Sequence, residues 1–415
     1  MKLLTLTYAY PPYHKGGYEI RCRDVMERLK QKGHEVLIVT TRHPSNRDAI
    51  KFNEPGIFRV MHHKFEPQTF PQRVLNDIKD TRFLKRIIEK YRPDVIYLWQ
   101  IATLSNMIIP FCANLNIPLY RDVADVGLLY DAKVQKQGLY FRSQPDDSRI
   151  KTLLREVAYK AIKLLSGNLL QPRWDWPLKM KINFNSENIK KDALKAGIPV
   201  EDARVIYAGV DTDIFTFNQK KALNSPLQII TPGRIVPLKG TRDSVLLLKY
   251  LVDQGIESGL TLAGAVGDQD YFDDLQQLIS DSGLVDHVIY AGMVSQEDLA
   301  KLYHQADFCF FPSYWKSGLS AVPLEAMASE CLVISYGNEN SAEIIENGHN
   351  GFIIDEGDYE AAASLIQKLQ DDQDQYGNIV ACARDEIDKK YTMDRYVDDL
   401  ESFLLESIQP MEGNA

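Results

Sequence analysis

Two cations stand close together in the second half of the chain, where an apolar strand is expected to lead into a helix. The segment LQIITPGRIVPLKG (227–240) places Arg234 just after the strand and Lys239 five residues later, at the start of the helix. Arginine offers a planar fork of donors and lysine a compact charge, so the pair could neutralise two phosphate groups. Neither residue is specific by itself, but together they suit a diphosphate.

A second group of candidates lies in the segment DFCFFPSYWKSGLSAVPLEAMASECLVIS (307–335). It predicts an apolar strand, a loop, a short helix that begins near Pro323 and a second apolar strand. Two parallel strands joined by a helix leave a ligand crevice outside the carboxyl end of the first strand, which is where residues 314–320 fall. The N–H groups that open a helix have no partner within it and suit an anion.

Glu325 is predicted in the first turn of that helix. A carboxylate in this place could accept hydrogen bonds from a vicinal diol, such as the diol of a ribose. The alternative is that Glu325 only complements the helix dipole.

The first half of the chain has a loop with two glycines between a predicted strand (3–10) and a predicted helix (18–32). Gly16 and Gly17 would let the backbone approach a ligand closely, although such pairs often serve only as turns. His14 and Lys15, in the same loop, could contact an acceptor or a phosphate, or could simply be exposed.

Asp122 and Asp125 are the acidic candidates of the first half. They lie at the carboxyl end of the predicted strand IPLYRDVAD (117–125), and ligands of parallel sheets bind at that end.

Strands and helices alternate along the whole chain, which predicts an α/β protein with parallel, doubly wound sheets. The remaining predicted strands are 34–41, 94–100, 180–185, 260–265, 287–294 and 332–337, and the remaining predicted helices include 76–91, 102–115, 148–167, 187–196 and 385–408. The polar segment FTFNQKKALNSP (215–226) suggests a linker. We expect domains at 1–210 and 227–390, a linker at 211–226, and a terminal helix with a disordered tail at 391–415.

The composition is that of a globular enzyme. The chain has 415 residues, 45% hydrophobic and 25% charged, which fits two or three domains. Its five cysteines show no CxxC spacing, which favours a reducing compartment without disulfides or a zinc site. No apolar run reaches the ~18 residues of a membrane span, and MKLLTLTYAYPP is better explained as a first strand than as a signal peptide.

Charge is distributed very unevenly. Residues 1–205 hold 35 Lys+Arg and 22 Asp+Glu, whereas residues 206–415 hold 13 and 35. The basic half suits an anionic lipid surface or is merely a solvated basic face, and no nucleic-acid motif accompanies it. Helix 148–167 has an apolar stripe with basic residues around it, as an interfacial membrane helix would, but a core-facing helix shows the same stripe.

Several segments, in this order, resemble the retaining glycosyltransferases of family 4. The resemblance runs from residue 1 to about residue 391. It rests on PPYHKGGYEI, RLKQKGHEVLIVT, VIYAGVDTDIF, ITPGRIVPLKG, HVIYAGMVSQEDLAKLYHQADFCFFPS, GLSAVPLEAMASECLVIS and AEIIENGHNGFII. It implies the GT-B fold, in which two Rossmann-like domains face each other across a cleft and a C-terminal helix crosses back to the N-terminal domain.

The activity implied by the resemblance is transfer of a sugar, with retention, from a nucleotide-sugar to a hydroxyl acceptor in glycan, polysaccharide or glycolipid biosynthesis. We expect a UDP-sugar as donor, a glycan or lipid-linked acceptor, no metal and no other cofactor. The N-terminal domain would bind the acceptor and the C-terminal domain the nucleotide-sugar. The expected location is the cytoplasm, with peripheral contact at the inner membrane face through helix 148–167.

The resemblance also implies residue roles. Arg234 and Lys239 would hold the diphosphate and stabilise the leaving group, and Asp125 would orient the acceptor, assisted by His14, Lys15 and Asp122. The further donor-binding residues would be Gly16, Gly17, Met293, Val294, Ser317, Gly318, Leu319, Ser320 and Glu325.

Two positions depart from the family pattern. Ser317 stands where the family usually has a glutamate, and Ala124 where it often has a histidine. Two alternatives therefore stay open: a catalytically impaired nucleotide-sugar-binding protein, and a GT-B epimerase or hydrolase. The Asp-Thr-Asp at 211–213 looks like a metal-binding DxD, but its context matches the interdomain segment of the family instead.

Overall fold

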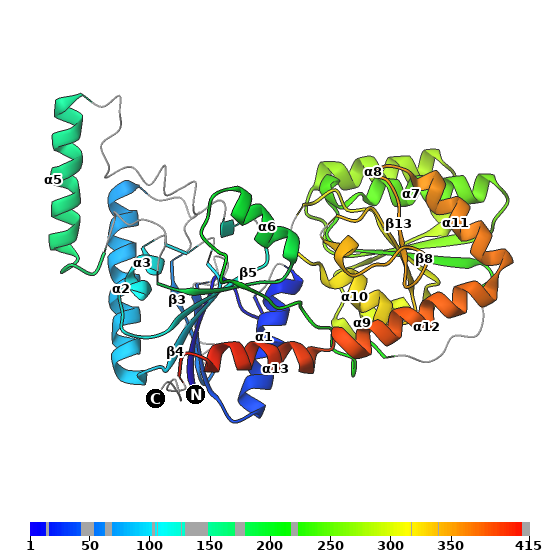
Figure 1. The fold of residues 1–415 in the computed structure, drawn as a ribbon. Coiled ribbons are helices and arrows are strands. Elements are labelled where there is room, and N and C mark those ends of the chain that lie inside the picture. The colour runs from blue at the N-terminus through cyan, green and yellow to red at the C-terminus, as the bar shows by residue number, and fades with distance from the viewer. Residues whose placement is uncertain are drawn as a thin grey trace. The chain divides into compact units, whose positions relative to one another are not determined.

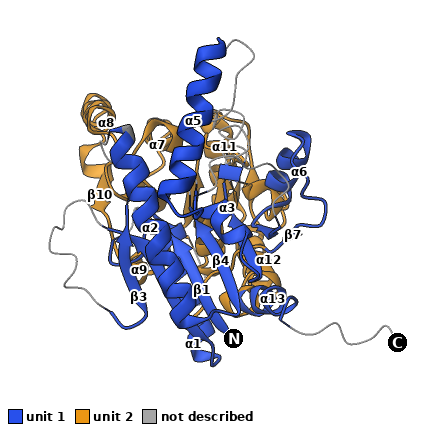
Figure 2. Ribbon diagram, turned by 90° about the vertical axis from the view of Figure 1, so that its left-hand side faces the viewer, with its two compact units in different colours: residues 1–206, 397–415 blue, residues 207–396 orange. Residues whose placement is uncertain are grey.

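The computed structural model describes residues 1–13, 16–42, 54–62, 69–101, 104–105, 107–125, 127–128, 148–170, 179–216, 223–316, 318–338 and 340–408. These form two compact units, shown in blue and orange in Figure 2. Unit 1 comprises residues 1–206 and 397–415, and unit 2 comprises residues 207–396. The segment expected as a linker, 211–226, falls within unit 2 in this division.

Unit 1 is built on a parallel sheet with the strand order β3-β2-β1-β4-β5-β6-β7. The strands are β1 (Lys2–Thr7), β2 (Glu35–Thr41), β3 (Ile57–Met61), β4 (Val95–Gln100), β5 (Leu119–Val123), β6 (Lys181–Phe184) and β7 (Arg204–Val205). The predicted strands of this half are confirmed, and β3 is an edge strand that the sequence did not reveal. The strand order reverses between β1 and β4.

The helices of unit 1 follow from local signals. They are α1 (Gly17–Gln31), α2 (Phe70–Tyr91), α3 (Ile108–Ala113), α5 (Arg149–Leu165) and α6 (Glu187–Lys195). Ser148 caps α5 and Ser186 caps α6, each by accepting a backbone N–H bond three residues ahead. The helix predicted at 102–115 is shorter, because α3 begins only at Ile108.

The single helix predicted at 385–408 is wrong, because α12 (Gln373–Lys390) ends before α13 (Met393–Leu405) begins. The last helix, α13, ends in unit 1, as predicted for a C-terminal helix that returns to the first domain. The Phe403 ring packs edge-on against Tyr120, with the ring centroids 4.9 Å apart. Glu401 pairs with His34 at 2.5 Å, and Glu406 with Lys181 at 3.2 Å. Both apolar and polar contacts therefore attach this helix to unit 1.

Unit 2 has a second parallel sheet, with the order β10-β9-β8-β11-β12-β13. Its strands are β8 (Leu227–Pro232), β9 (Ser258–Ala263), β10 (Val288–Gly292), β11 (Phe308–Phe311), β12 (Leu332–Ser335) and β13 (Phe352–Ile353). The order reverses between β8 and β11, which pair through Phe308 with Ile229 and Cys309 with Ile230. The predicted parallel sheet of the second half is confirmed.

Two apolar clusters, one for each face of this sheet, form the core of unit 2. Alternate residues of β11 point to opposite faces, so that Phe308 and Phe310 join one cluster and Cys309 the other. The helices are η2 (Pro237–Lys239), α7 (Thr241–Asp253), α8 (Gln269–Asp281), η3 (Val285–His287), α9 (Gln296–Gln305), α10 (Ala321–Ala328), η4 (Ser341–Glu343), α11 (Tyr359–Asp371) and α12 (Gln373–Lys390). Figure 1 shows α9, α10 and α12 together on one side of the sheet.

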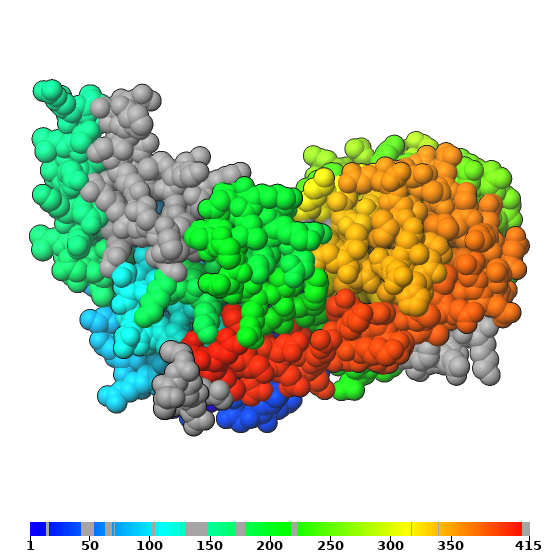
Figure 3. Space-filling view, viewed as in Figure 1, coloured from blue at the N-terminus to red at the C-terminus, as the bar shows by residue number. Residues whose placement is uncertain are grey.

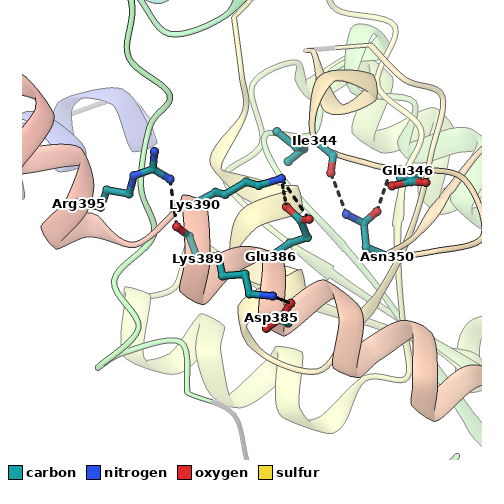
Figure 4. Close-up of polar contacts among 8 residues, drawn as sticks. All are labelled: Ile344, Glu346, Asn350, Asp385, Glu386, Lys389, Lys390 and Arg395. Atoms are coloured by element: carbon teal, nitrogen blue, oxygen red, sulfur yellow. Dashed lines mark hydrogen bonds and ion pairs between the residues drawn. The ribbon is translucent and has the colours of Figure 1, made fainter.

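Polar contacts fix the end of α12 (Figure 4). Arg395 donates to the backbone oxygen of Lys389 at 3.1 Å, and Lys389 and Lys390 pair with Asp385 and Glu386 one turn earlier. These exposed contacts lie on the helical layer rather than at the carboxyl ends of the strands.

Candidate functional site

The loops after β8 and β11 start side by side, because these two strands are neighbours at the point where the strand order reverses. In open parallel sheets a ligand binds outside the carboxyl ends of the strands at this point. Arg234 follows β8, and Gly318, Leu319 and Ser320 follow β11. Two predicted groups of residues that are far apart in the sequence therefore share one edge of the sheet.

Arg234 lies on a tight turn whose backbone is held by the neighbouring loop. Gly233 has φ +134° and donates to the carbonyl of Ala263 at 2.8 Å, and Ile235 donates to Ala265 at 2.9 Å. An L side chain rarely adopts the Gly233 conformation, so the turn requires glycine. The turn leaves the Arg234 side chain exposed to solvent at the end of β8.

Lys239 ends the short helix η2 and extends towards β11. Its Nζ lies 5.8 Å from the centroid of the Phe311 ring, at the end of that strand. Gly240 follows with φ +66°, and a Cβ there would lie 2.0 Å from the carbonyl oxygen of Pro312. Because Tyr314 also donates its N–H to Leu238 at 2.9 Å, the loop that carries Lys239 is fastened to the loop after β11.

The helix after β11 begins two residues earlier than predicted, so placing Glu325 in its first turn was wrong. Ser320 caps α10 by accepting the N–H of Val322 at 3.4 Å. Pro323 is tolerated inside the first turn because its missing N–H would have no partner there. Glu325 consequently lies in the second turn, and the dipole explanation of this residue loses its basis.

Glu325 has an unusual environment for a carboxylic acid. It is only partly exposed, and its Oε2 accepts the Tyr303 hydroxyl at 3.3 Å. Burial raises the pKa of Glu325 to about 7, and the tyrosine bond lowers it by a smaller amount. A carboxyl group that changes charge near neutral pH is typical of functional sites.

Met293 and Val294 follow β10, immediately before the capping residue of α9. The Met293 side chain is 75% exposed, and Val294 is half-buried. They follow the carboxyl end of β10, whereas Arg234 follows the carboxyl end of β8, two strands away in the same sheet.

The sequence did not reveal a three-residue cluster that braces this edge. Asp243, in the first turn of α7, accepts the hydroxyls of Tyr314 at 2.5 Å and Tyr336 at 2.8 Å. Burial, followed by the bond to Asp243, raises the pKa of Tyr314 to about 12. The three residues come from α7 and from the ends of β11 and β12, so no local pattern could have indicated the cluster.

Gly16 caps α1 in unit 1 and Gly17 is the first residue of this helix, and both are exposed. Gly16 is extended, and a Cβ there would have Glu19 as its nearest neighbour at 3.8 Å; a Cβ on Gly17 would meet nothing within 4 Å. Glu19 holds the turn by accepting the N–H of Gly16 at 2.9 Å and the Tyr8 hydroxyl at 2.6 Å. Neither strain nor packing against the described residues therefore explains these two glycines.

Asp122 is buried inside β5 with 4% exposure, rather than open at its end. Its carboxylate accepts the Tyr18 hydroxyl, the Tyr97 hydroxyl at 3.1 Å and the Asn183 amide at 2.6 Å. Burial raises the pKa of Asp122, and Arg21 opposes this rise. The expected direct contact of Asp122 with an acceptor is therefore corrected, because protein donors occupy both of its oxygens. Asp122 instead holds Tyr18, whose hydroxyl also donates to the Trp99 carbonyl at 3.0 Å.

Asp125 lies past the end of β5 and is partly exposed. Its Oδ1 accepts the N–H of Gly127 at 2.7 Å, so one oxygen fixes the local turn. His14, Lys15 and Ser317 lie outside the described residues.

Metal-binding groups are absent from the part of the chain that the structure describes: no three or more His, Cys, Asp or Glu residues gather there in a suitable arrangement. In the Asp-Thr-Asp segment, Asp211 accepts the N–H of Asp213 at 3.1 Å, as in an Asx turn. No helix in the described ranges is long and apolar enough to cross a membrane.

Family comparisons agree with the two-unit organisation. Residues 213–386 match the model of "Glycosyl transferases group 1", and residues 15–158 match that of "Glycosyltransferase Family 4". The chain is 26% identical over 200 residues to the amylovoran biosynthesis glycosyltransferase AmsK of Erwinia amylovora, covering 47% of this chain and 48% of the relative. The capsular polysaccharide biosynthesis glycosyltransferase CapM of Staphylococcus aureus is 27% identical over 46% of this chain and 50% of its own length. The chain thus spans about half the length of these relatives.

Solved structures share the whole fold at low identity. HepE of Anabaena, crystallised with UDP, has a TM-score of 0.69 at 17% identity and covers 97% of this chain and 99% of its own. Sucrose-phosphate synthase of Thermosynechococcus elongatus has a TM-score of 0.72 at 17% identity, covering 97% and 98%. At such identities the likeness establishes the GT-B fold alone.

Proposed function

We propose that this chain, which belongs to the group 1 glycosyltransferases of the family 4 type, transfers a sugar from a UDP-sugar to a hydroxyl of a glycan or a lipid-linked acceptor. One observation carries the proposal: Arg234 and Lys239 stand on fastened loops at the reversal point of the unit 2 sheet. Two cations at the carboxyl edge of a parallel sheet suit a diphosphate. UDP is the nucleotide of choice because the similar HepE structure was solved with it.

Arg234 and Lys239 act as electrostatic stabilisers of the leaving group. As the bond between the anomeric carbon and the phosphate oxygen breaks, negative charge grows on the diphosphate, and the two fixed cations bind this charge more tightly than the ground state. They supply the positive charge that a divalent metal provides in other enzymes, so we propose that transfer is metal-independent.

Glu325 fits a role at the ribose of the donor. Its carboxylate, in the second turn of α10, could accept hydrogen bonds from the two ribose hydroxyls. Met293 and Val294 offer an apolar surface for the base, and Gly318, Leu319 and Ser320 form the approach to the α10 N-terminus, where the dipole favours phosphate.

Retention is proposed to follow from attack on the face that the leaving group vacates. The acceptor oxygen forms the new bond to the anomeric carbon, and its proton passes to the departing phosphate oxygen, so no protein base is needed. Asp125 has one oxygen engaged with Gly127, and we propose that its carboxylate orients the acceptor hydroxyl. Gly16 and Gly17 leave room for a ligand to approach the backbone at the start of α1.

A second candidate is nucleotide-sugar binding without transfer. It is favoured by Ser317 and Ala124, which replace residues that the family usually carries at these positions. A GT-B epimerase or hydrolase would need further acid–base groups, and the described carboxylate at this edge other than Glu325, that of Asp243, is already bonded to the hydroxyls of Tyr314 and Tyr336.

A thermal-shift screen tests the proposal. The protein is heated with UDP, GDP, ADP and their common sugars, in EDTA and in Mg²⁺. A ligand at ~100 times its Kd stabilises the folded state by about 2.7 kcal/mol, so a true donor raises Tm measurably. We expect UDP and its sugars to raise Tm equally in EDTA and Mg²⁺, and then to yield transfer with crude acceptor glycans or lipids. Binding without transfer would favour the second candidate, and no shift with any nucleotide would refute both.

The site of action is part of the proposal. The basic first half of the chain suits peripheral contact with the anionic inner face of a membrane, where a lipid-linked acceptor would be found.

A further inference from the structure

The apolar stripe of α5 faces outwards. Six large apolar side chains of this helix are more than half exposed: Ile150 72%, Leu153 65%, Leu154 62%, Val157 56%, Leu164 80% and Leu165 65%. In the space-filling view no other described segment covers the side of α5 that is seen (Figure 3). Removing that much apolar surface from water would be favourable, and exposed apolar patches of this kind mark surfaces that bind a protein or a membrane.

An ordinary core-facing helix turns its apolar side towards the protein, whereas α5 turns its apolar side towards solvent. At 100° per residue the six exposed side chains fall within about 120° of the helix circumference. The opposite side carries Ile162, which is buried against Ile78 of α2 and Leu170, and the half-buried Arg155 and Tyr159. Arg82 of α2 also donates to the Leu165 carbonyl at 3.2 Å. The explanation as a core-facing helix therefore does not hold, because the apolar side is not the side that packs against α2.

Basic residues border the exposed stripe on both sides. Lys160 lies just beyond the edge formed by Leu153, and Lys151 just beyond the edge formed by Leu165, when the helix is projected on its circumference. Both lysines are exposed, as are Arg149 and Lys163. Long cationic side chains at the edges of an apolar stripe can reach anionic headgroups while the stripe enters the acyl region.

We propose that α5 lies in the surface plane of an anionic bilayer, with its outward stripe inserted and the bordering lysines on the lipid headgroups. A second copy of the chain is a poorer occupant, because the bordering cations of the two helices would be brought together, with Glu156 as the one acidic residue between Arg149 and Leu165. A bilayer offers both the apolar interior and the opposite charge.

This inference deepens the proposed function and rests on it in one respect: a lipid-linked acceptor gives the docking its purpose. The docking itself requires neither donor nor acceptor, so the two proposals fail separately.

Co-sedimentation with vesicles tests the docking. The full chain is mixed, without nucleotide, with two kinds of vesicle. Neutral vesicles contain phosphatidylcholine alone, and anionic vesicles contain phosphatidylcholine with about 30% phosphatidylserine. We expect binding to the anionic vesicles, weakened at high salt.

Leu153→Gln with Leu154→Gln should lower the partition coefficient by about 100-fold, because both side chains enter the acyl boundary. Lys151→Gln with Lys160→Gln should lower it by about 20-fold on anionic vesicles and leave the neutral ones unchanged.

The control is Leu194→Gln on α6, a partly exposed leucine of the same unit. It should bind vesicles as the wild type does, and all variants should keep the wild-type circular dichroism and the wild-type response to UDP. The proposal is overturned if the wild type does not sediment with anionic vesicles, or if the Leu153/Leu154 variant sediments as well as it does. Self-association that this variant abolishes, without vesicle binding, would assign the stripe to a second copy instead. Vesicle binding without a nucleotide response would refute the donor proposal and leave the docking standing.

Discussion

The two sheets hold their main charged candidates differently, and the net charge of each half of the chain does not predict the sign of those candidates. Residues 206–415 hold 13 Lys+Arg against 35 Asp+Glu, yet the reversal point of their sheet presents Arg234 and Lys239. Residues 1–205 hold 35 against 22, yet a carboxylate, that of Asp122, is buried inside β5 of their sheet. Local placement at the strand ends, rather than overall charge, determines what each sheet can bind.

Accessibility separates the two regions as well. Arg234 is exposed and Glu325 partly so, whereas Asp122 is 4% exposed and its oxygens are occupied by Tyr18, Tyr97 and Asn183. In unit 2, glycine-dependent loops hold charged side chains towards solvent. In unit 1, the buried acidic side chain of Asp122 holds the helix α1 in place through Tyr18. The first arrangement is suited to a charged ligand and the second to support.

Arg234→Ala should give the largest effect. Loss of one fixed donor to the developing charge on the leaving group should lower kcat by about 10²–10³-fold. Initial rates of UDP release in the presence of acceptor measure it. Arg395→Ala is the matched control, since Arg395 donates to the Lys389 carbonyl on the helical layer, away from the strand ends, and should keep the wild-type rate. An Arg234→Ala enzyme that is as fast as Arg395→Ala would remove the functional contrast between the two regions.

Gly240→Ala tests the loop that holds Lys239. Its Cβ would lie 2.0 Å from the Pro312 carbonyl oxygen, so the free energy of unfolding should fall by about 3 kcal/mol. Gly255→Ala is the control for backbone strain without a clash, because Gly255 has φ +80° and a Cβ there would meet no atom within 4 Å. It should lower the free energy of unfolding by about 1 kcal/mol. Thermal and urea unfolding provide both values. Equal losses in the two variants would mean that contact with Pro312 does not fix this loop.

Glu325→Gln sharpens the comparison through pH. The folded-state pKa of Glu325 is raised to about 7 from 4.5, so the carboxyl favours folding most below pH 4.5, and this contribution is lost as pH rises through 7. Donor binding favours the ionised form, so affinity for UDP-glucose should rise about tenfold between pH 6 and pH 8. In Glu325→Gln the affinity should be about tenfold lower at pH 8 and flat with pH. Calorimetric titration at several pH values decides, and a persisting slope in the variant would assign the titration to another group.

Tyr18→Phe should have the smallest effect and should act in unit 1 alone. Loss of the hydroxyl removes its bonds to Asp122 and to the Trp99 carbonyl, which should lower the free energy of unfolding by about 1–2 kcal/mol. Affinity for UDP should be unchanged, because this network supports α1 rather than the donor. Weaker UDP binding by a fully folded Tyr18→Phe protein would contradict the supporting role of Asp122.

The order of strands and helices could be predicted from the sequence because each carries a local signal. The run that became β11 is continuously apolar and the run that became β8 is mostly so, and Gly33 and Gly197 mark the ends of α1 and α6. Arg234 and Lys239 could be proposed as partners because both belong to one short segment. The placement of each on the shared edge followed from the βαβ rule.

What could not be predicted depends on contacts between distant segments. The burial of Asp122 requires Tyr18 and Asn183, which lie 104 and 61 residues away. The Asp243 cluster joins three elements in the same way. The stripe of α5 is visible in the sequence, but which way it points is set by Ile162 and its contacts with α2. The start of α10 was missed because Ser320 outweighs Pro323 as the signal for the first turn.

The central claim is that the cations of unit 2 bind the diphosphate of a nucleotide-sugar without a metal. Calorimetric titration of UDP-glucose in EDTA, for the wild type, Arg234→Ala and Arg395→Ala, tests it most directly. The account predicts metal-independent binding that is at least tenfold weaker in Arg234→Ala and unchanged in Arg395→Ala. Equal affinity in all three proteins, or binding that appears only when Mg²⁺ is restored, would contradict it.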